Sequence, residues 1–308
     1  MTLPQHGLPD RQPPLRLDSL SHDSSAPAST GGVAESTLGK ERALVAWLRQ
    51  RGPILVGYSG GVDSSYLAVV ALESLGPAGV LAVIGRSASY PASQWATARQ
   101  VADRFGVPVL EVDTDEIHDA RYAANPTNRC YFCKSVLWDT LVPIAEQRGF
   151  ATIVDGTNAD DLRDHRPGAA AASERRVASP LAELGFSKGE IRALSMARGL
   201  PTWSQPASPC LSSRLPYGTA VTPERLRLVE RAEEALRALG VTGDLRVRFH
   251  GDLARVELCA EELPRWLVGD RSVKLAAAVR AVGFSRVAVD LRGFRSGSLN
   301  VLGGVSHG

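Results

Sequence analysis

A loop rich in glycine and serine, SGGVDSS at residues 59–65, lies directly between a short apolar run and a helical pattern. The apolar residues 54–56 are typical of a buried strand, and the apolar residues from Leu67 to Leu72 recur at helical spacing. A strand that passes through a glycine turn into a helix is a building unit of parallel α/β sheets. This segment therefore constrains the fold more than any other part of the chain.

The same alternation continues on both sides of the loop. A short amphipathic helix is predicted to begin at Glu41 and to end at Gly52. Strands are predicted at 53–58, 80–85, 107–112 and 152–155, and helices at about 63–75, 91–105 and 134–148. Strands that alternate with helices predict an α/β fold with a doubly wound parallel sheet.

The composition divides the chain into three regions. Residues 1–38 are rich in Pro, Ser, His and Gly and lack apolar periodicity, so we expect a disordered tail. Residues 39–200 contain the alternating pattern, and residues 201–308 are predicted to form a separate, smaller α+β domain. Its predicted elements are a helix at 223–239, a hairpin that turns at Gly251-Asp252, a helix near 271–282 and a strand at 285–291.

Charge and cysteine content exclude some classes of protein. The 308 residues, 44% of them hydrophobic, suffice for two modest domains. A formal net charge of +2 gives no argument for a nucleic-acid surface. Four cysteines are too few for a disulfide scaffold, and neither a leader nor a membrane-length apolar run is present. We expect a cytoplasmic protein without nucleic-acid or membrane partners.

The glycine loop is predicted to bind phosphate. Ligands of α/β sheets bind at the carboxyl ends of strands, where a loop that enters a helix offers backbone N–H groups and a positive dipole end. A Walker A motif is excluded because the lysine and the longer glycine spacing are absent. The loop resembles the SGGxDS loop of PP-loop ATP pyrophosphatases, which adenylate a substrate oxygen and release pyrophosphate. This resemblance implies an ATP site at Ser59, Gly60, Gly61, Asp63, Ser64 and Ser65.

Three cysteines lie in positions that suit chemistry. Cys130 and Cys133 form a Cys-x-x-Cys pair in NPTNRCYFCKS, which we place in a loop that runs into a helix. That spacing fits a metal or cluster, a redox pair or no function at all. Cys210 lies among prolines in a stiff loop near the predicted domain junction, where an exposed thiol can act as a nucleophile. Cys259 ends an alternating strand and is interpreted as a core thiol.

Five segments beyond the loop carry a more specific resemblance. They are, in order, NRCYFCKS, DGTNADDLRDHRPG, SPLAELGFSKGEIRAL, PTWSQPASPCLSSRLPYG and LRVRFHGDLARVE. Together they resemble the LarE family of ATP-dependent sulfur transferases over about residues 40–292. That family converts the carboxylates of a pyridinium biscarboxylic acid mononucleotide to thiocarboxylates, a step toward the nickel-pincer nucleotide of lactate racemase. The resemblance implies this small-molecule substrate, homo-oligomers and a nickel-inserting protein that acts downstream.

The resemblance also implies a source of sulfur. Cys210 matches the sulfur-donating cysteine, which in single-cysteine members gives up its own sulfur and becomes dehydroalanine. Members that also carry the Cys-x-x-Cys pair are thought to hold a [4Fe-4S] cluster on three thiolates, which leaves one iron free to carry sulfide. Because this chain contains Cys130, Cys133 and Cys210, we expect the cluster version, with ATP and Mg²⁺ as the other cofactors.

Polar residues beyond the loop are candidates for the nucleotide site. Gly156 and Thr157 follow the strand at 152–155, at the same predicted sheet edge as the loop, although a plain turn would look alike. Mg²⁺ prefers carboxylate oxygens, so the candidate magnesium ligands are Asp63, Asp160 and Asp161. A solvated helix start is the alternative for the last two.

Arginines mark a candidate substrate site. Arg214 follows Cys210 closely and has the fork geometry that clamps a phosphate or carboxylate. Arg246 and Arg248 are two residues apart on a predicted strand, so their side chains share one face. The family resemblance implies that this strand binds the substrate phosphate. A solvated strand face is the alternative. Glu233 and Glu234, on the preceding helix, are candidate partners of these arginines.

Three other functions stay open at this point. A tRNA thiolase also joins a PP-loop to a Cys-x-x-Cys pair and a later cysteine, although the near-neutral charge and the lack of an RNA-binding appendage argue against it. An ATP-dependent amide-forming synthetase would need an ammonia source and would tolerate loss of Cys210. A nucleotide-binding regulatory protein would carry out no chemistry.

Overall fold

The computed structural model describes residues 33–163, 167–206 and 208–295. The tail that the sequence predicts to be disordered spans residues 1–38, and residues 1–32 of it lie outside the described residues. Within the described ranges, no helix combines the length and the apolar character that crossing a membrane requires.

A parallel four-stranded sheet confirms the predicted α/β class. Its strands are β1 (Ile54–Gly57), β2 (Val80–Arg86), β3 (Val109–Asp113) and β4 (Thr152–Val154), in the order β3-β2-β1-β4. Ile54 pairs with Val80 on one side and with Thr152 on the other. The strand order therefore changes direction between β1 and β4, and ligands of such sheets bind at the carboxyl ends of strands that flank this point.

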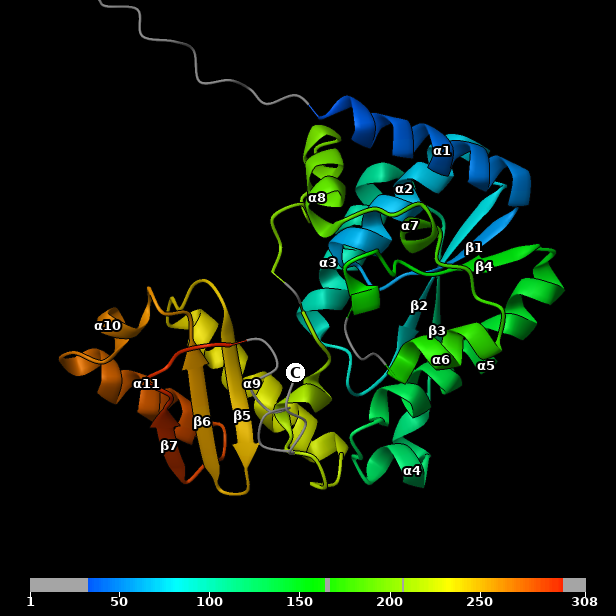
Figure 1. Cartoon of the computed structure of the whole chain (residues 1–308). Helices are drawn as coiled ribbons and strands as arrows, with labels where there is room; N and C mark the ends of the chain where they lie inside the picture. The colour runs from blue at the N-terminus through cyan, green and yellow to red at the C-terminus, as the bar shows by residue number, and fades with distance from the viewer. Residues whose placement is uncertain (1–32, 164–166, 207, 296–308) are drawn as a thin grey trace, which may run out of the picture. The chain divides into compact units, whose positions relative to one another are not determined.

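Helices cover both faces of this sheet because successive strand side chains point to opposite faces. The helices of the N-terminal region, not all of which cover the sheet, are α1 (Glu35–Arg51), α2 (Val62–Leu75), α3 (Ala92–Phe105), α4 (Ala120–Ala123), α5 (Arg129–Arg148), α6 (Pro167–Glu174), α7 (Pro180–Glu183) and α8 (Lys188–Ala197), with 3-10 turns η1 (Glu116–His118) and η2 (Asp161–Arg163). Val56 packs in a core with α1, α2, α3 and α8, whereas Leu55 packs in a second core with α5 and α6. Figure 1 shows these two helix layers.

Helix α1 begins at Glu35, before the predicted start at Glu41, so its first turn includes residues assigned to the tail. Contacts with the α8 region explain the earlier start. The Lys40 ammonium donates to Glu190 (2.8 Å), and the hydroxyl of the buried Thr37 lies 3.3 Å from the same carboxylate. Tertiary contacts of this kind extend a helix beyond the segment that local propensity supports.

Helix α5 begins at Arg129, so Cys130 and Cys133 lie on a helix. The prediction that a loop holds this pair was therefore wrong. Phe132 and Cys133 pack against the core of the C-terminal region, and Tyr131 packs against the core below the sheet. These apolar contacts stabilise the first turns of the helix, and the Asn-Pro run that suggested a loop ends before them.

The C-terminal region forms a small mixed sheet, and its core also includes Tyr122 of α4. Strands β5 (Leu245–His250), β6 (Leu253–Leu258) and β7 (Arg286–Val289) lie in that order, with β5 and β6 antiparallel and β6 and β7 parallel. Its helices are α9 (Pro223–Ala238), α10 (Leu263–Trp266) and α11 (Asp270–Ala281), and the 3-10 turn η3 spans Leu211–Arg214. Leu226 and Val229 of α9 pack with Val247 and Val256 of the hairpin. Figure 1 shows α9 beside β5 and β6. The predicted smaller α+β region is confirmed, and the domain boundaries at 39 and 200 stay predictions.

Candidate active site

The glycine loop connects β1 to α2, as its sequence predicts. Helix α2 begins at Val62 with Gly61 as its N-cap. Gly60 has a φ of +68°, and a Cβ at this position would lie 2.5 Å from the Cβ of Ala98 on α3. Both constraints require glycine. The loop therefore approaches α3 closely and points the N–H groups of the first turn of α2 toward the carboxyl edge of the sheet.

Two serines shape the loop from inside. The Ser59 N–H donates to the Ser64 hydroxyl (3.2 Å), and the Ser64 hydroxyl in turn donates to the Gly61 carbonyl (3.3 Å). Outside the loop, the Tyr90 hydroxyl and the Gln94 side-chain amide each donate to the Ser59 carbonyl at 3.0 Å. Ser65 is buried behind the loop. These bonds hold the cradle in one conformation before any phosphate binds.

The end of β4 lies against the start of α2. A Cβ on Gly156 would lie 2.8 Å from the backbone nitrogen of Ser64, so glycine is needed for this approach. Asp155 fixes the turn, since its carboxylate accepts bonds from the Thr157 N–H (3.0 Å), the Thr157 hydroxyl (2.9 Å) and the Ser179 hydroxyl (2.8 Å). Gly156 and Thr157 are thus beside the glycine loop, where the order of the strands places them.

Acidic residues of the site meet a lysine that the sequence reasoning did not single out. Asp63 forms an ion pair with the Lys188 ammonium at the start of α8. Its second carboxylate oxygen, Oδ1, is buried and has no hydrogen-bond partner among the described residues. The backbone N–H of Lys188 donates to Asp160 (2.8 Å). Asp161 instead accepts from the Asn158 N–H (3.2 Å). The structure therefore brings Asp63 and Asp160 together around Lys188.

A signal for Lys188 is present in the sequence. Ser187 and Glu190 form a capping box, which starts α8 at Lys188. A cation in the first turn of a helix is disfavoured by the helix dipole, so a lysine there needs a compensating negative charge. Asp63 provides that charge.

The unpartnered oxygen of Asp63 fits a divalent cation. Mg²⁺ in nucleotide sites is held by one or two carboxylates together with the phosphates of the nucleotide. Across the residues that the structure describes, no group of three His, Cys, Asp or Glu side chains could hold a metal ion by itself. A magnesium ion at this place would therefore depend on ATP phosphates for most of its ligands.

Three free thiols from two segments lie near one another. Cys130 is exposed and Cys133 half-buried on α5, while Cys210 precedes η3 with its sulfur 2.9 Å from the Ser212 hydroxyl oxygen. Desolvation by the surrounding protein, followed by the charge of Cys210, raises the pKa of Cys130. Burial also raises the pKa of Cys133, with further contributions from Glu116 and Cys210. The three cysteines predicted to act together are thus within electrostatic reach of one another.

The predicted [4Fe-4S] cluster gains no support from this arrangement. Cys130, Cys133 and Cys210 do not form a metal-binding group in the described part of the chain. All three are free thiols. We therefore derive no chemical step through a cluster, and the cluster stays a prediction from the family resemblance.

Backbone contacts tie the Cys210 loop to the carboxyl edge of the parallel sheet. The Leu211 N–H donates to the carbonyl of Ser89, which follows β2 (2.8 Å). A second contact joins helix α9 to the same edge, since the Ala92 N–H at the start of α3 donates to the side chain of Glu230 (2.7 Å). Because β2 pairs with β1 in parallel, this edge is also where the glycine loop begins.

Arg214 is engaged with the protein itself. Its side chain is buried, with Nε and Nη2 donating to Glu233 at 2.9 and 2.8 Å. Its Nη1 donates to the carbonyls of Pro209 (2.6 Å) and Cys210 (3.1 Å). Arg214 thus holds the cysteine loop in place, and its predicted role as a clamp for substrate phosphate stays a prediction.

Arg246 and Arg248 lie on one face of β5, as the alternation predicts. Arg248 donates to Glu257 through Nε (3.0 Å) and Nη2 (2.8 Å). Burial, followed by the like charge of Arg214, lowers the pKa of Arg246 to about 10. Glu233 and Glu257 already contact two of these guanidinium groups, those of Arg214 and Arg248. The predicted role of Arg246 and Arg248 at the substrate phosphate therefore stays a prediction.

Two glutamates complete the surroundings of the arginines, and one was missed from the sequence. Glu257 is fully buried and also accepts from Arg255 (2.9 Å). The sequence feature that could have identified Glu257 is its position opposite Arg246 in the hairpin register. Glu233 additionally accepts from the Val247 N–H (2.9 Å), whereas Glu234 is exposed on α9.

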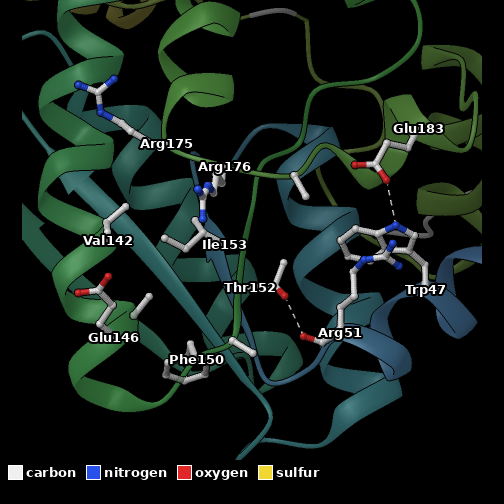
Figure 2. A pocket seen from close by; sticks show the side chains of 13 residues that line it. Trp47, Arg51, Val142, Glu146, Phe150, Thr152, Ile153, Arg175, Arg176 and Glu183 are labelled. Carbon is white, nitrogen blue, oxygen red and sulfur yellow. Dashed lines mark hydrogen bonds between the residues drawn. The ribbon is translucent and has the colours of Figure 1, made fainter.

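A cavity of about 460 Å³ lies at a different place in the fold. Arg51 at the end of α1 and Thr152 at the start of β4 line it, so it belongs to the amino end of β4, opposite the glycine loop. Figure 2 shows the Trp47 indole N–H donating to Glu183 (2.9 Å) and the Thr152 hydroxyl donating to the Arg51 carbonyl (2.9 Å). Its described lining includes none of the residues predicted to form the site.

Known proteins resemble the chain in the same regions. Residues 45–132 match the NAD synthase family. An uncharacterized protein of Synechocystis sp. is 46% identical over 246 residues, which are 80% of this chain and 91% of that protein. The pyridinium-3,5-bisthiocarboxylic acid mononucleotide synthase of Lactiplantibacillus plantarum is 36% identical over 261 residues, or 85% of this chain and 94% of the synthase. A glutamine-hydrolyzing GMP synthase of Phenylobacterium zucineum is 26% identical over 213 residues, or 59% and 39% of the two chains.

Proposed function

Because the chain belongs to the PP-loop ATP pyrophosphatase family that includes the Lactiplantibacillus plantarum synthase, we propose that it is an ATP-dependent sulfur transferase. Its proposed substrate is a pyridinium biscarboxylic acid mononucleotide, and its product the corresponding thiocarboxylate. The observation that supports this most is a group of three free thiols, one of which belongs to Cys210. The loop that contains Cys210 is hydrogen-bonded through Leu211 to Ser89, at the sheet edge where the glycine loop begins. An enzyme that only adenylates would not need these thiols.

The first half-reaction is adenylation. A carboxylate oxygen of the substrate attacks the α-phosphorus of ATP, and the bond between that phosphorus and pyrophosphate breaks. The N–H groups at the start of α2 and the Lys188 ammonium, which pairs with Asp63, would hold the phosphates. Asp63 would hold Mg²⁺ through its unpartnered oxygen, and the bound ion would neutralise phosphate charge.

The second half-reaction moves sulfur. The sulfur of Cys210 attacks the carbonyl carbon of the acyl adenylate, the bond from that carbon to the phosphate oxygen of AMP breaks, and a thioester to Cys210 forms. Loss of the Cα proton of residue 210 and cleavage of its Cβ–Sγ bond would then release the thiocarboxylate and leave dehydroalanine. Cys210 is the proposed donor position, because Arg214 holds its carbonyl at 3.1 Å and its sulfur contacts the Ser212 hydroxyl. Arg246 and Arg248 would bind the phosphate of the substrate nucleotide.

The resemblance to GMP synthase keeps an amide-forming synthetase as the second candidate. Such an enzyme would perform the same adenylation and then accept ammonia. Homo-oligomers, a nickel-inserting partner and a cytoplasmic location stay predictions of the family resemblance.

One experiment separates these functions. Purified protein is incubated anaerobically with ATP, Mg²⁺ and the dicarboxylate mononucleotide, and product mass, AMP and pyrophosphate are measured. We expect a thiocarboxylate, which is heavier than the carboxylate by the difference between sulfur and oxygen. Cys210→Ser should still release pyrophosphate and yield no thiocarboxylate. Amide formation with added ammonia by Cys210→Ser, or sulfur incorporation into tRNA instead of the nucleotide, would overturn the proposal.

A further inference from the structure

The cavity at the amino end of β4 has no role in the proposed reaction. Its volume of about 460 Å³ is within the range of about 300–1,000 Å³ that is typical of small-molecule sites. Much of its wall is apolar, and the side chains that form this part include Val142, Ala145, Phe150 and Ile153. Three arginines and two glutamates also line it. A concave, largely apolar space with a few charged groups is the usual form of a ligand site.

Two of the three arginines have no acidic partner. Arg175 is paired, since its guanidinium donates to the two carboxylate oxygens of Asp139 at 2.7 and 3.0 Å. Within the residues that the structure describes, the side chains of Arg51 and Arg176 form neither an ion pair nor a hydrogen bond, and both are exposed. Their N–H donors are therefore free to bind a ligand.

The two glutamates of the lining are engaged differently. Glu183 accepts the indole N–H of Trp47 (2.9 Å). Glu146 is exposed on α5, and its carboxylate has no partner in the described part of the chain. Arginines outnumber glutamates in the lining, so the cavity favours an anion over a cation.

Arg51 is held in position by Trp47. Its guanidinium carbon lies 4.4 Å from the centre of the indole ring, which is buried and fixed by its bond to Glu183. The Thr152 hydroxyl donates to the backbone carbonyl of Arg51 (2.9 Å). Figure 2 shows Arg51 beside Trp47 and Thr152. An arginine whose planar head is fixed in advance loses less conformational entropy when it binds an anion.

Arg176 occupies a backbone position that favours glycine. Its φ is +56°, a left-handed conformation that is costly for a residue with a Cβ. The Arg176 N–H donates to the Ser173 carbonyl (3.1 Å), and the Val177 N–H donates to the Ala172 carbonyl (3.0 Å). A helix that ends with these two bonds usually has glycine at this place. No contact of the Arg176 side chain within the described ranges offsets this cost, so binding a ligand is a reason for an arginine here.

We propose that this cavity is a second ligand site, which binds a small organic oxyanion through Arg51 and Arg176. The oxyanion is a phosphate or carboxylate group, because guanidinium forks match the oxygens of both. Either group alone would fill only a small part of the cavity, and the apolar wall with Phe150 suits a flat ring attached to it. The site is separate from the glycine loop, since Thr152 begins β4 whereas Gly156 follows its end.

Calorimetric titration with small probes tests the proposal. Phenyl phosphate and benzoate present the two head groups on a ring, and inorganic phosphate and acetate present them without one. A saturating non-hydrolysable ATP analogue is included to keep the probes from the glycine loop. We expect saturable binding of at least one ring probe, and binding of the matching ringless ion that is at least tenfold weaker. The ring probe that binds more tightly identifies the head group.

Substitutions in the lining locate the bound probe. Arg51→Gln and Arg176→Gln should each weaken binding about tenfold, because each removes charge-assisted hydrogen bonds. Glu146→Gln should strengthen binding about twofold, because it removes a negative charge that faces the anion. Arg148→Gln is the matched control and should bind like wild type, since it removes an exposed arginine at the end of α5 that does not line the cavity.

Several results would overturn the proposal. They are the lack of saturable binding of both ring probes at millimolar concentration, wild-type affinity in both arginine variants, and an equal loss in Arg148→Gln. Thermal unfolding shows whether each variant is folded. If one arginine variant does not fold, the other decides, and if neither folds, unchanged or weaker binding by Glu146→Gln would overturn the proposal. Because no turnover is measured, failure here leaves the proposed sulfur transfer untouched.

Discussion

Lys188, at the start of α8, forms an ion pair with Asp63 in the first turn of α2, across 125 residues of sequence. The pair joins the phosphate-binding loop to a helix that the chain reaches only after the whole parallel sheet is complete. Since the Lys188 side chain is 35% exposed, the pair contributes little to stability. Its importance is expected in catalysis, where a positive charge next to the loop can stabilise the leaving pyrophosphate.

Replacing Lys188 by Ala should lower the rate of pyrophosphate release about a hundredfold. The thermal unfolding midpoint should stay near that of wild type, because a part-exposed ion pair contributes at most about 1 kcal/mol. Lys274→Ala is the matched control, since it removes an exposed lysine that pairs with Asp270 at 2.6 Å on α11. Equal rates for the two variants would contradict a role for Lys188 at the phosphates.

Asp63→Asn and Ser59→Ala should each abolish most pyrophosphate release while the protein stays folded. Asp63→Asn removes the candidate magnesium ligand, and Ser59→Ala removes a hydroxyl that lies 3.1 Å from that of Ser64. Pyrophosphate exchange and circular dichroism measure the two effects separately. Undiminished turnover in both variants would count against the phosphate cradle.

Gly156→Ala should weaken ATP binding at least tenfold and destabilise the fold by about 1–3 kcal/mol, because the added Cβ would lie 2.8 Å from the backbone nitrogen of Ser64. Calorimetric ATP titration and urea unfolding measure these changes. Gly189→Ala is the control, since a Cβ there meets only the Ser187 hydroxyl at 4.0 Å. It lies on α8 and should be neutral or slightly stabilising. Similar losses in both variants would exclude the steric explanation.

Glu257→Gln should destabilise the C-terminal region by about 3–5 kcal/mol, because it removes the buried carboxylate that lies 2.8 Å from the Arg248 guanidinium. Chemical denaturation measures this loss. Glu35→Gln breaks an exposed pair with Arg42 and should cost at most about 1 kcal/mol. A loss of similar size in both variants would mean that burial of Glu257 has no energetic consequence.

Mass spectrometry after turnover decides between the two sources of sulfur. If Cys210 gives up its own sulfur, position 210 should lose about 34 Da and turnover should stop at one sulfur per chain. If three thiolates hold a cluster, Cys130→Ala should lose bound iron and activity together. A double variant of Cys130 and Cys133 that is fully active and carries dehydroalanine at position 210 would rule out the cluster.

Local patterns predicted most of the parallel sheet. Strand β1 was expected at 53–58 and is found at Ile54–Gly57, and helix α2 was expected at 63–75 and is found at Val62–Leu75. Such segments are predictable because periodicity and turn residues act over a few neighbours in the chain. The position of Gly156 at the end of a parallel strand likewise predicted that it lies at the same sheet edge as the glycine loop, and it approaches Ser64 of α2 closely.

Features that depend on distant partners were not predictable in this way. Helix α5 starts earlier than its local sequence indicates because Phe132 packs into a core formed by the C-terminal region. The buried pairing of Glu257 with Arg248 follows from packing of the hairpin. In each case the stabilising free energy comes from burial against segments that are distant in the sequence. A local sequence pattern does not indicate that burial.

The sequence by itself determined the class of fold, the glycine loop between β1 and α2 and the identity of the three cysteines, since each depends on neighbouring residues. Only the tertiary structure decided which groups face one another. It joined Lys188 to Asp63 and paired the buried Arg248 with Glu257. The physical reason is that charge balance in a protein interior is set by distances in space, and these distances exist only after the chain has folded.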